Sequence, residues 1–311
     1  MNKFSLTYTP YTLQLKNPFI TSKKTIKNRK GFIIELEDSE GNTGTGDVCP
    51  FPEFGSESLS NAENSLKGLN LNVKIDRSKV EESIYECLKD YNDLPALRHG
   101  IEQALINLLC RKENTSVNKF LRLKLKKKIK VNAAIGFMDA EKSAEIAKNL
   151  LKNGFRTLKI KVGRKNFQYD YSVIKAIRHK VGSEIKLRID ANGIWNLKDA
   201  IANLKTLDDF DIEYAEQPVN TVDDYMELKR NSDVPLAPDE SIRSVKDAKQ
   251  FIDSGTLSYI VLKPMMISGL LPTLEIINYA EENNVSPVIT TSFDSAIGKS
   301  NAVIAAATVK S

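Results

Sequence analysis

Residues 156–163 read RTLKIKVG, a short apolar stretch in which a single isoleucine separates two lysines. The alternation is typical of a β-strand, on which side chains two apart point to the same face. A helical pattern, YDYSVIKAIRHKVG (169–182), follows it. From about residue 129 onward the chain contains seven such strand–helix repeats of roughly 25 residues each. Short apolar strands alternating with amphipathic helices predict a parallel sheet with covered faces, either an open doubly wound sheet or a closed barrel.

The charged residues of this region decide between the two arrangements. Five consecutive strands are apolar inside and carry ionisable residues at their carboxyl ends: in order, Lys159 and Lys161, Asp190, Glu216, Asp239 and Lys263. A barrel brings all its strand ends to one mouth, where catalytic groups lie, whereas an open sheet spreads them across its width. The sequence therefore predicts an α/β protein with a TIM-like barrel over residues 129–311.

Three carboxylates at one mouth predict a metal site. Burying Asp190, Glu216 and Asp239 together is costly unless a cation compensates them. Three carboxylate oxygens leave positions open for water and substrate oxygens, which suits Mg²⁺. No histidine or cysteine accompanies these residues, so the donor set disfavours zinc.

The lysine pair predicts a catalytic base. Two ammonium groups about 6–7 Å apart, at an effective dielectric of about 20, repel by about 2–3 kcal/mol, which lowers the pKa of one of them. A lysine lowered toward neutrality acts as a general base. Lys263, four strands further along, is expected to face the substrate from the other side. Lysines beside Mg²⁺ permit proton abstraction next to a carboxylate.

The first part of the chain, residues 1–113, is predicted to be a separate α+β unit. Its strands include a hairpin with the turn at Glu40-Gly41-Asn42, and its clearest helix covers 94–112. Two loops are expected to close over the barrel mouth, a polar one at 21–30 and one at 49–58 rich in proline and aromatic residues. In the second loop, the side chains expected to exclude water are Phe51, Pro52 and Phe54.

The composition excludes several classes of protein. The 311 residues are 41% hydrophobic and carry a formal net charge of +5, which favours at most a small anionic substrate. The basic run LRLKLKKKIK (121–130) is predicted to be a solvated connector, since no nucleic-acid-binding motif accompanies it. There is no signal-like or membrane-spanning apolar stretch, and three cysteines without metal-like spacing are expected to be free thiols. We expect a soluble cytoplasmic protein, and no oligomeric state is predicted.

The ordered motifs KIK, DAN, EQP, PDES and LKP resemble the muconate-lactonizing subgroup of the enolase superfamily, and the N-terminal unit resembles its capping domain. The resemblance implies that Lys161 is the base, that Lys159 tunes it, and that Lys263 lies opposite. It implies Mg²⁺, with Mn²⁺ as a substitute, on the three carboxylates. The residues expected to support the metal ligands or to lie near the substrate are Arg188, Asn192, Glu240 and Ser292. The seventh strand, VITTSFDS, lacks the histidine of the mandelate-racemase subgroup, and His99 and His179 are expected to be structural or surface residues.

Within the subgroup, the proline after Lys263 and the loop CPFPEFGSES resemble the o-succinylbenzoate synthase family. That resemblance implies a hydro-lyase of menaquinone biosynthesis. Its reaction is the syn dehydration of 2-succinyl-6-hydroxy-2,4-cyclohexadiene-1-carboxylate through an enediolate. Dipeptide epimerases, N-acylamino-acid racemases and an inactive binding relative are the alternatives.

The end of the chain departs from the family pattern. After the seventh strand comes one helix, GKSNAVIAAATVKS, whereas family members continue into an eighth strand. We therefore expect a (β/α)7β-type barrel that lacks its eighth strand in this chain.

Overall fold

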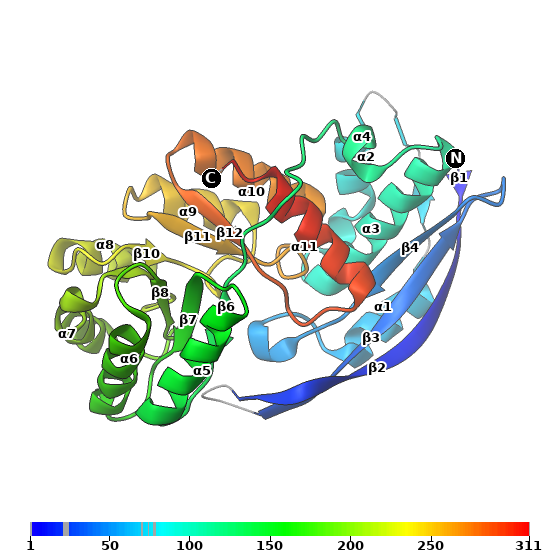
Figure 1. The fold of residues 1–311 in the computed structure, drawn as a ribbon. Helices are drawn as coiled ribbons and strands as arrows, with labels where there is room; N and C mark the ends of the chain where they lie inside the picture. Colours follow the sequence, from blue (N-terminus) through cyan, green and yellow to red (C-terminus); the bar gives the residue numbers. More distant parts are fainter. Residues whose placement is uncertain (1, 21–24, 70, 74, 77–78, 311) are drawn as a thin grey trace.

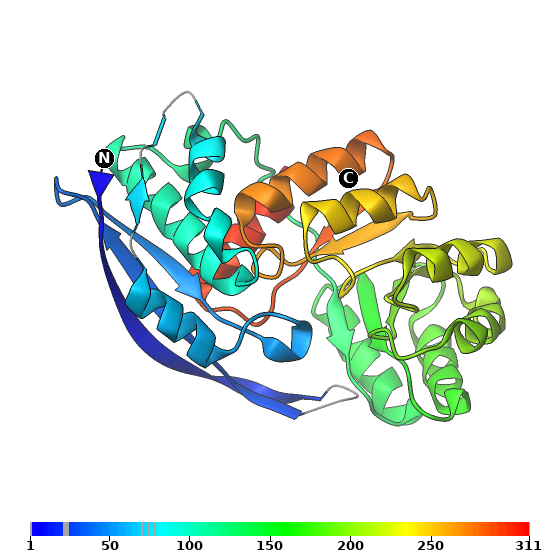
Figure 2. The ribbon, with the colours of Figure 1, turned by 180° about the vertical axis from the view of Figure 1, so that it is seen from behind.

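The computed structural model describes residues 2–20, 25–69, 71–73, 75–76 and 79–310. Figure 1 and, from behind, Figure 2 show two parts, a cap that contains the N-terminus and a curved array of strands and helices beside it. The cap consists of β1 (Asn2–Lys3), β2 (Ser5–Ile20), β3 (Thr25–Glu37), β4 (Thr43–Val48), η1 (Pro52–Phe54), α1 (Leu59–Gly68), β5 (Asn72–Val73), α2 (Val80–Cys87), η2 (Lys89–Tyr91), α3 (Pro95–Lys112) and α4 (Val117–Phe120).

The second part repeats a strand and a helix seven times. Its elements are β6 (Ala133–Ile135), α5 (Ala140–Lys152), β7 (Thr157–Lys161), α6 (Phe167–Val181), β8 (Lys186–Asp190), α7 (Leu197–Thr206), η3 (Asp208–Phe210), β9 (Ile212–Glu216), α8 (Val222–Asn231), β10 (Leu236–Ala237), α9 (Val245–Asp253), β11 (Tyr259–Leu262), α10 (Leu270–Glu282), β12 (Ser286–Ile289) and α11 (Ala296–Thr308).

The strands of the second part follow one another in chain order. Strands β6 to β10 form one parallel sheet, and β11 pairs with β12 in parallel. The N–H of Val261 donates to the carbonyl of Pro238 at 2.9 Å, which joins β11 to the end of β10. A doubly wound sheet reverses its strand order at a switch point, and this one does not. The predicted barrel architecture with an N-terminal cap is confirmed.

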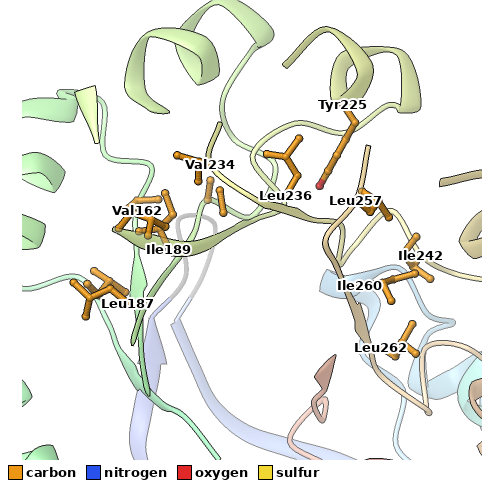
Figure 3. Close-up of a cluster of buried hydrophobic side chains, with 14 of the residues drawn as sticks. Val162, Leu187, Ile189, Tyr225, Val234, Leu236, Ile242, Leu257, Ile260 and Leu262 are labelled. Carbon is orange, nitrogen blue, oxygen red and sulfur yellow. The ribbon is translucent and has the colours of Figure 1, made fainter. Parts of the chain in front are cut away.

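The barrel strands bury apolar side chains on their outer face, against the helices. Leu187 and Ile189 on β8, and Leu236, Ile260 and Leu262 on the following strands, belong to this cluster (Figure 3). A smaller cluster of Tyr214, Ala237 and Val261 fills the inside of the barrel. Because side chains alternate along a strand, the inner face is left free to carry the charged residues.

Polar caps fix where the barrel helices begin. Each capping side chain accepts a hydrogen bond from a backbone N–H of the first helical turn, which satisfies a donor that the helix itself leaves unpaired. The caps are Asp139, Asn166, Asn196, Thr221, Ser244 and Ser295, at the starts of α5, α6, α7, α8, α9 and α11. The strand–helix loops are therefore held at the carboxyl ends of the strands.

In the cap, an antiparallel sheet with strand order β2-β3-β4 packs on the long helix α3. The predicted hairpin turn is confirmed, because the Asp38 carboxylate accepts from the N–H groups of Glu40 and Asn42 between β3 and β4. Helix α3 confirms the helix predicted over 94–112. His99 lies buried in it between the Asp47 carbonyl and the Asn301 side chain, a structural role, while His179 is exposed on α6.

The polar loop predicted over 21–30 is wrong for residues 25–30, which belong to strand β3; residues 21–24 lie outside the described ones. Lys30, Arg29 and Asn28 pair with Thr12, Leu13 and Gln14 of β2. Cross-strand pairing overrides the low strand propensity of this lysine- and asparagine-rich stretch.

The connector between α4 and β6 is exposed through its basic run, as predicted. The three cysteines are free thiols, which was also predicted. Among the described residues, no helix has the length and apolarity needed to cross a membrane.

Replacing Gly46 should weaken the cap. A Cβ at Gly46 would lie 1.9 Å from the carbonyl oxygen of Gly100 on α3, so the strand and helix must separate. We expect Gly46→Ala to lower the free energy of unfolding by about 1–3 kcal/mol. Gly68→Ala, where a Cβ would meet nothing within 4 Å, is the control. Denaturant unfolding of both variants checks this, and equal stabilities would contradict the close packing of β4 on α3.

Candidate active site

Adjacent strands bring the charged residues into one row. In the sheet register Lys161 on β7 stands beside Asp190 on β8, and Asp190 stands beside Glu216 on β9. Each residue is the last of its strand. Asp239 and Lys263 follow the ends of β10 and β11 and line the same cavity. The structure therefore brings together all six strand-end residues that the sequence singled out.

The lysines pair with the carboxylates. Lys159 Nζ lies 2.7 Å from Glu216 Oε1 and 3.0 Å from Asp190 Oδ2. Lys161 Nζ lies 2.6 Å from Asp190 Oδ2, and Lys263 forms an ion pair with Asp239. All three carboxylates are buried, so these pairs are poorly screened by solvent.

The pairing changes the expected lysine electrostatics. Burial alone would lower the pKa of Lys159, but the carboxylates of Asp190, Glu216 and Asp239 outweigh burial and raise it well above its usual range. Burial would likewise raise the pKa of Asp190, yet Lys159 and Lys161 hold it well below the ordinary value. For Lys159 the attraction of these carboxylates therefore dominates. The predicted tuning of Lys161 by Lys159 stays a prediction.

The donor set fits a divalent cation by its chemistry. Three buried carboxylates, Asp190, Glu216 and Asp239, share this cavity with three lysines. Burial and the neighbouring Asp190 raise the pKa of Glu216 to about 8, so this carboxylate is not fully compensated. The ammonium of Lys159 bridges Asp190 and Glu216, as a cation would. In the part of the chain that is described, no three acidic, histidine or cysteine side chains are gathered closely enough to hold a metal as they stand. A metal would therefore take over the charge balance that the lysines provide here.

A polar chain supports Lys161 from behind. Its Nζ lies 2.7 Å from Asn192 Oδ1, and Asn192 Nδ2 donates to Glu240 Oε1 at 2.7 Å. Because Glu240 occupies the amide nitrogen, the amide oxygen of Asn192 faces the lysine. Glu240 Oε2 is buried and has no hydrogen-bond partner among the described residues. Asn192 and Glu240 thus lie where the sequence expected supporting residues.

The charged row forms the floor of a cavity of about 440 Å³. Phe51 and Phe54 of the cap cover one side, with their ring centroids 4.5 Å apart, and the Phe54 ring lies 5.2 Å from Lys263 Nζ. Pro52 is exposed and starts the short η1 turn between them. Ser292, after β12, lines the cavity, and its buried hydroxyl has no partner among the described residues. The other wall residues are Pro18, Asn132, Ala134, Gly136, Phe137, Met138, Tyr214, Val261, Val288, Ile289, Thr290, Thr291 and Phe293.

Arg188 lies two residues before Asp190 on β8, deeper in the barrel. Its Nε donates to Glu213 Oε2 at 2.5 Å in an ion pair, and its Nη1 donates to Asn132 Oδ1 at 3.1 Å. Its guanidinium carbon lies 4.7 Å from the Tyr214 ring centroid. The register shift between β8 and β9 brings Glu213 beside it. Its contacts are with the barrel interior, below the carboxylate row, rather than with a metal ligand.

Sequence reasoning missed two contributors to this site. Gln217, in the EQP motif, accepts through its side-chain oxygen from the N–H of Asp239 at 2.7 Å and so joins the ends of β9 and β10. Its positive φ of 42° carries no sequence signal. Arg29, which was assigned to a loop, donates to the carbonyls of Cys49 and Ser292 beside the cavity. No local pattern in residues 25–30 signals this role.

Family comparison agrees with the fold and the arrangement of the site. The family described as "Enolase C-terminal domain-like" matches residues 142–311, and "MenC, N-terminal domain" matches residues 4–108. The first match covers more than half of the chain. A barrel with this cap and with lysines and carboxylates on successive strand ends defines an enolase-type enzyme, and the chain belongs to the enolase superfamily.

Individual relatives differ in activity. An N-succinyl-L-Arg/Lys racemase of Bacillus cereus is 25% identical over 93% of this chain and 79% of its own. An o-succinylbenzoate synthase of Bacillus subtilis is 29% identical over 88% of this chain and 74% of its own. The crystal structure of a dipeptide epimerase from Enterococcus faecalis, complexed with Mg and L-Leu-L-Tyr, matches with a TM-score of 0.89 at 27% identity, covering 100% of this chain and 88% of that one.

Replacing Arg188 separates a structural role from a metal-orienting one. We expect Arg188→Ala to lower the free energy of unfolding by about 2 kcal/mol, because Glu213 loses a charged partner. The rise in melting temperature on adding Mg²⁺ should remain, whereas Asp190→Asn, the comparison variant, should lose it. Thermal melts with and without Mg²⁺ measure both. An Arg188→Ala protein of normal stability whose melting temperature no longer rises with Mg²⁺ would instead show that Arg188 supports a metal ligand.

Proposed function

We propose that this protein is a cytoplasmic, Mg²⁺-dependent o-succinylbenzoate synthase, a hydro-lyase of menaquinone biosynthesis. The observation that carries the proposal is the match of residues 4–108 to the MenC N-terminal domain, joined to a barrel with lysines on both sides of one cavity. The relative from Bacillus subtilis supports it, and the free thiols suit a reducing compartment.

The cavity wall supports a ring substrate without an ammonium group. Phe51, Phe54, Phe137, Val261 and Val288 offer apolar surface to a cyclohexadiene ring. Outside the strand-end cluster, the described residues that line the cavity include no carboxylate, so a dipeptide's free ammonium finds no separate partner among them. A dicarboxylic acid instead meets a wall that includes the polar residues Thr290 and Thr291.

In the proposed reaction Lys161 Nζ takes the proton from the carbon next to the ring carboxylate. The hydroxyl group on the neighbouring carbon then leaves and receives this proton from Lys161, so the C–H and C–O bonds break, a C=C bond forms and water is released. Lys263 remains charged and stabilises the negative charge that develops on the carboxylate oxygens. Mg²⁺ on Asp190, Glu216 and Asp239 would supply Lewis-acid polarisation of that carboxylate.

Epimerisation or racemisation is the second candidate. It is favoured by the position of Lys263, which lines the cavity four strands beyond Lys161, since one lysine can remove a proton and the other return one to the opposite face. The Bacillus cereus racemase and the Enterococcus faecalis epimerase are relatives with such activities.

Turnover of 2-succinyl-6-hydroxy-2,4-cyclohexadiene-1-carboxylate tests the proposal. We expect conversion to o-succinylbenzoate with Mg²⁺ and none with EDTA, followed by absorbance. Dipeptides and N-succinylamino acids in deuterium oxide form the second arm, in which exchange at the α-carbon reports epimerisation. Exchange without dehydration, by a folded protein, would replace the synthase with the second candidate.

Lys161→Ala should reduce turnover about a thousandfold, because the proton acceptor is lost. The fold should persist, since Asp190 retains Lys159 as a partner. Lys165→Ala, at an exposed position four residues further on, is the matched control and should keep full activity. Steady-state rates and a circular dichroism spectrum of each variant check this. A Lys161→Ala enzyme with more than a tenth of the original rate would rule out Lys161 as the base.

A further inference from the structure

We propose that Arg29 is a positioning residue that holds the two walls of the active-site cavity in register. The first wall is the cap segment 49–54, which carries Phe51 and Phe54 over the cavity. The second is segment 290–293, which follows β12 in the barrel. The inference rests on the proposed function only in taking this cavity as the place of reaction.

The guanidinium of Arg29 donates hydrogen bonds to backbone carbonyls of both walls. Its Nη2 and Nη1 donate to the carbonyls of Cys49 at 2.8 Å and Pro50 at 2.9 Å. Its Nε donates to the carbonyl of Ser292 at 3.0 Å, across 263 positions of sequence. Arg29 is buried at 5% exposure, so these charge-assisted bonds meet little competition from water.

Arg29 also supports the aromatic cover directly. Its guanidinium carbon lies 4.0 Å from the centroid of the Phe51 ring. Phe51 packs on Phe54, and Phe54 lies over the ammonium of Lys263. A contact path therefore runs from a cap strand to a lysine at the barrel mouth, and loss of its first member frees the two rings.

On the barrel side, Arg29 fixes Ser292, whose hydroxyl has no hydrogen-bond partner among the described residues. Ser292 is held at its carbonyl by Arg29 and at its N–H by Asp294 Oδ1 at 3.2 Å. Asp47 of the cap, which accepts from the Ser295 N–H at 3.0 Å and the Tyr11 hydroxyl at 2.7 Å, anchors the same loop further on. With the backbone of Ser292 held on both sides, its side chain has a fixed place in the wall.

An arginine elsewhere in the chain offers a matched control. Arg178 on α6 also donates to backbone carbonyls, among them Phe210 at 2.8 Å, Gly182 at 2.8 Å and Ile185 at 2.6 Å. These carbonyls precede β8 and β9, at the ends of the strands away from the cavity. Loss of Arg178 therefore removes a comparable set of bonds without touching either wall.

The test compares Arg29→Ala with Arg178→Ala in the full chain. For the substrate that the wild-type protein converts, we expect Arg29→Ala to lower kcat/KM at least tenfold, mainly through KM, and Arg178→Ala to change it less than twofold. Millimolar guanidinium should restore part of the Arg29→Ala loss. If Arg29→Ala does not fold, Arg29→Lys carries the same test, because an ammonium cannot reach three carbonyls in the planar arrangement.

Amide hydrogen exchange supplies a readout that needs no substrate. In Arg29→Ala, or in Arg29→Lys, exchange should accelerate at least tenfold in both 49–54 and 290–293, with the Mg²⁺-induced rise in melting temperature retained. Unchanged exchange in either segment overturns the proposal, as does equal loss of kcat/KM in the Arg178→Ala protein. Because this arm is independent of turnover, an incorrect substrate assignment leaves it intact.

Discussion

Buried charge at the mouth of the barrel is the constraint on which the rest of the structure depends. Asp190 and Glu216 are each 1% exposed, and a carboxylate taken out of water is unfavourable by several kcal/mol unless it is compensated. Lysines from β7 and from the end of β11 provide that compensation. The apolar outer faces of the strands provide the burial. Because opposite charges pair within the site, the ionised side chains are held in place before any ligand binds.

The cap encloses the cavity whose floor is formed by the charged strand-end residues. Strands of the barrel supply the charged side chains, whereas the aromatic cover comes from a segment more than a hundred residues earlier in the chain. The position of the cap relative to the barrel must therefore be fixed to within hydrogen-bond distances. The bonds of Asp47 and Arg29 to the loop before α11 fix that position. The close approach of β4 to α3 at Gly46 holds the strand that carries Asp47.

The sequence predicted the repeated strand–helix units and the ionisable residues at the ends of their strands. Strand–helix alternation identified the barrel, and ionisable residues at the strand ends identified the row from Lys161 to Glu216, because both patterns are local. It failed where register decides. Residues 25–30 look like a loop until their partner strand β2 is known. For Arg188, strand periodicity indicates its face, but its partner Glu213 comes from a register shift on β9 that no local pattern reveals.

The same charged floor is compatible with dehydration and with epimerisation, since both begin by removing a proton next to a carboxylate. Discrimination therefore has to come from the walls, which decide where the remainder of the substrate lies relative to Lys161 and Lys263. In this chain the walls are backbone segments whose positions depend on a few buried polar side chains. A change in one of those buried polar side chains shifts several wall contacts at once and leaves the charged strand-end residues unaltered. Substrate preference in such an architecture can thus change through residues that never touch the substrate.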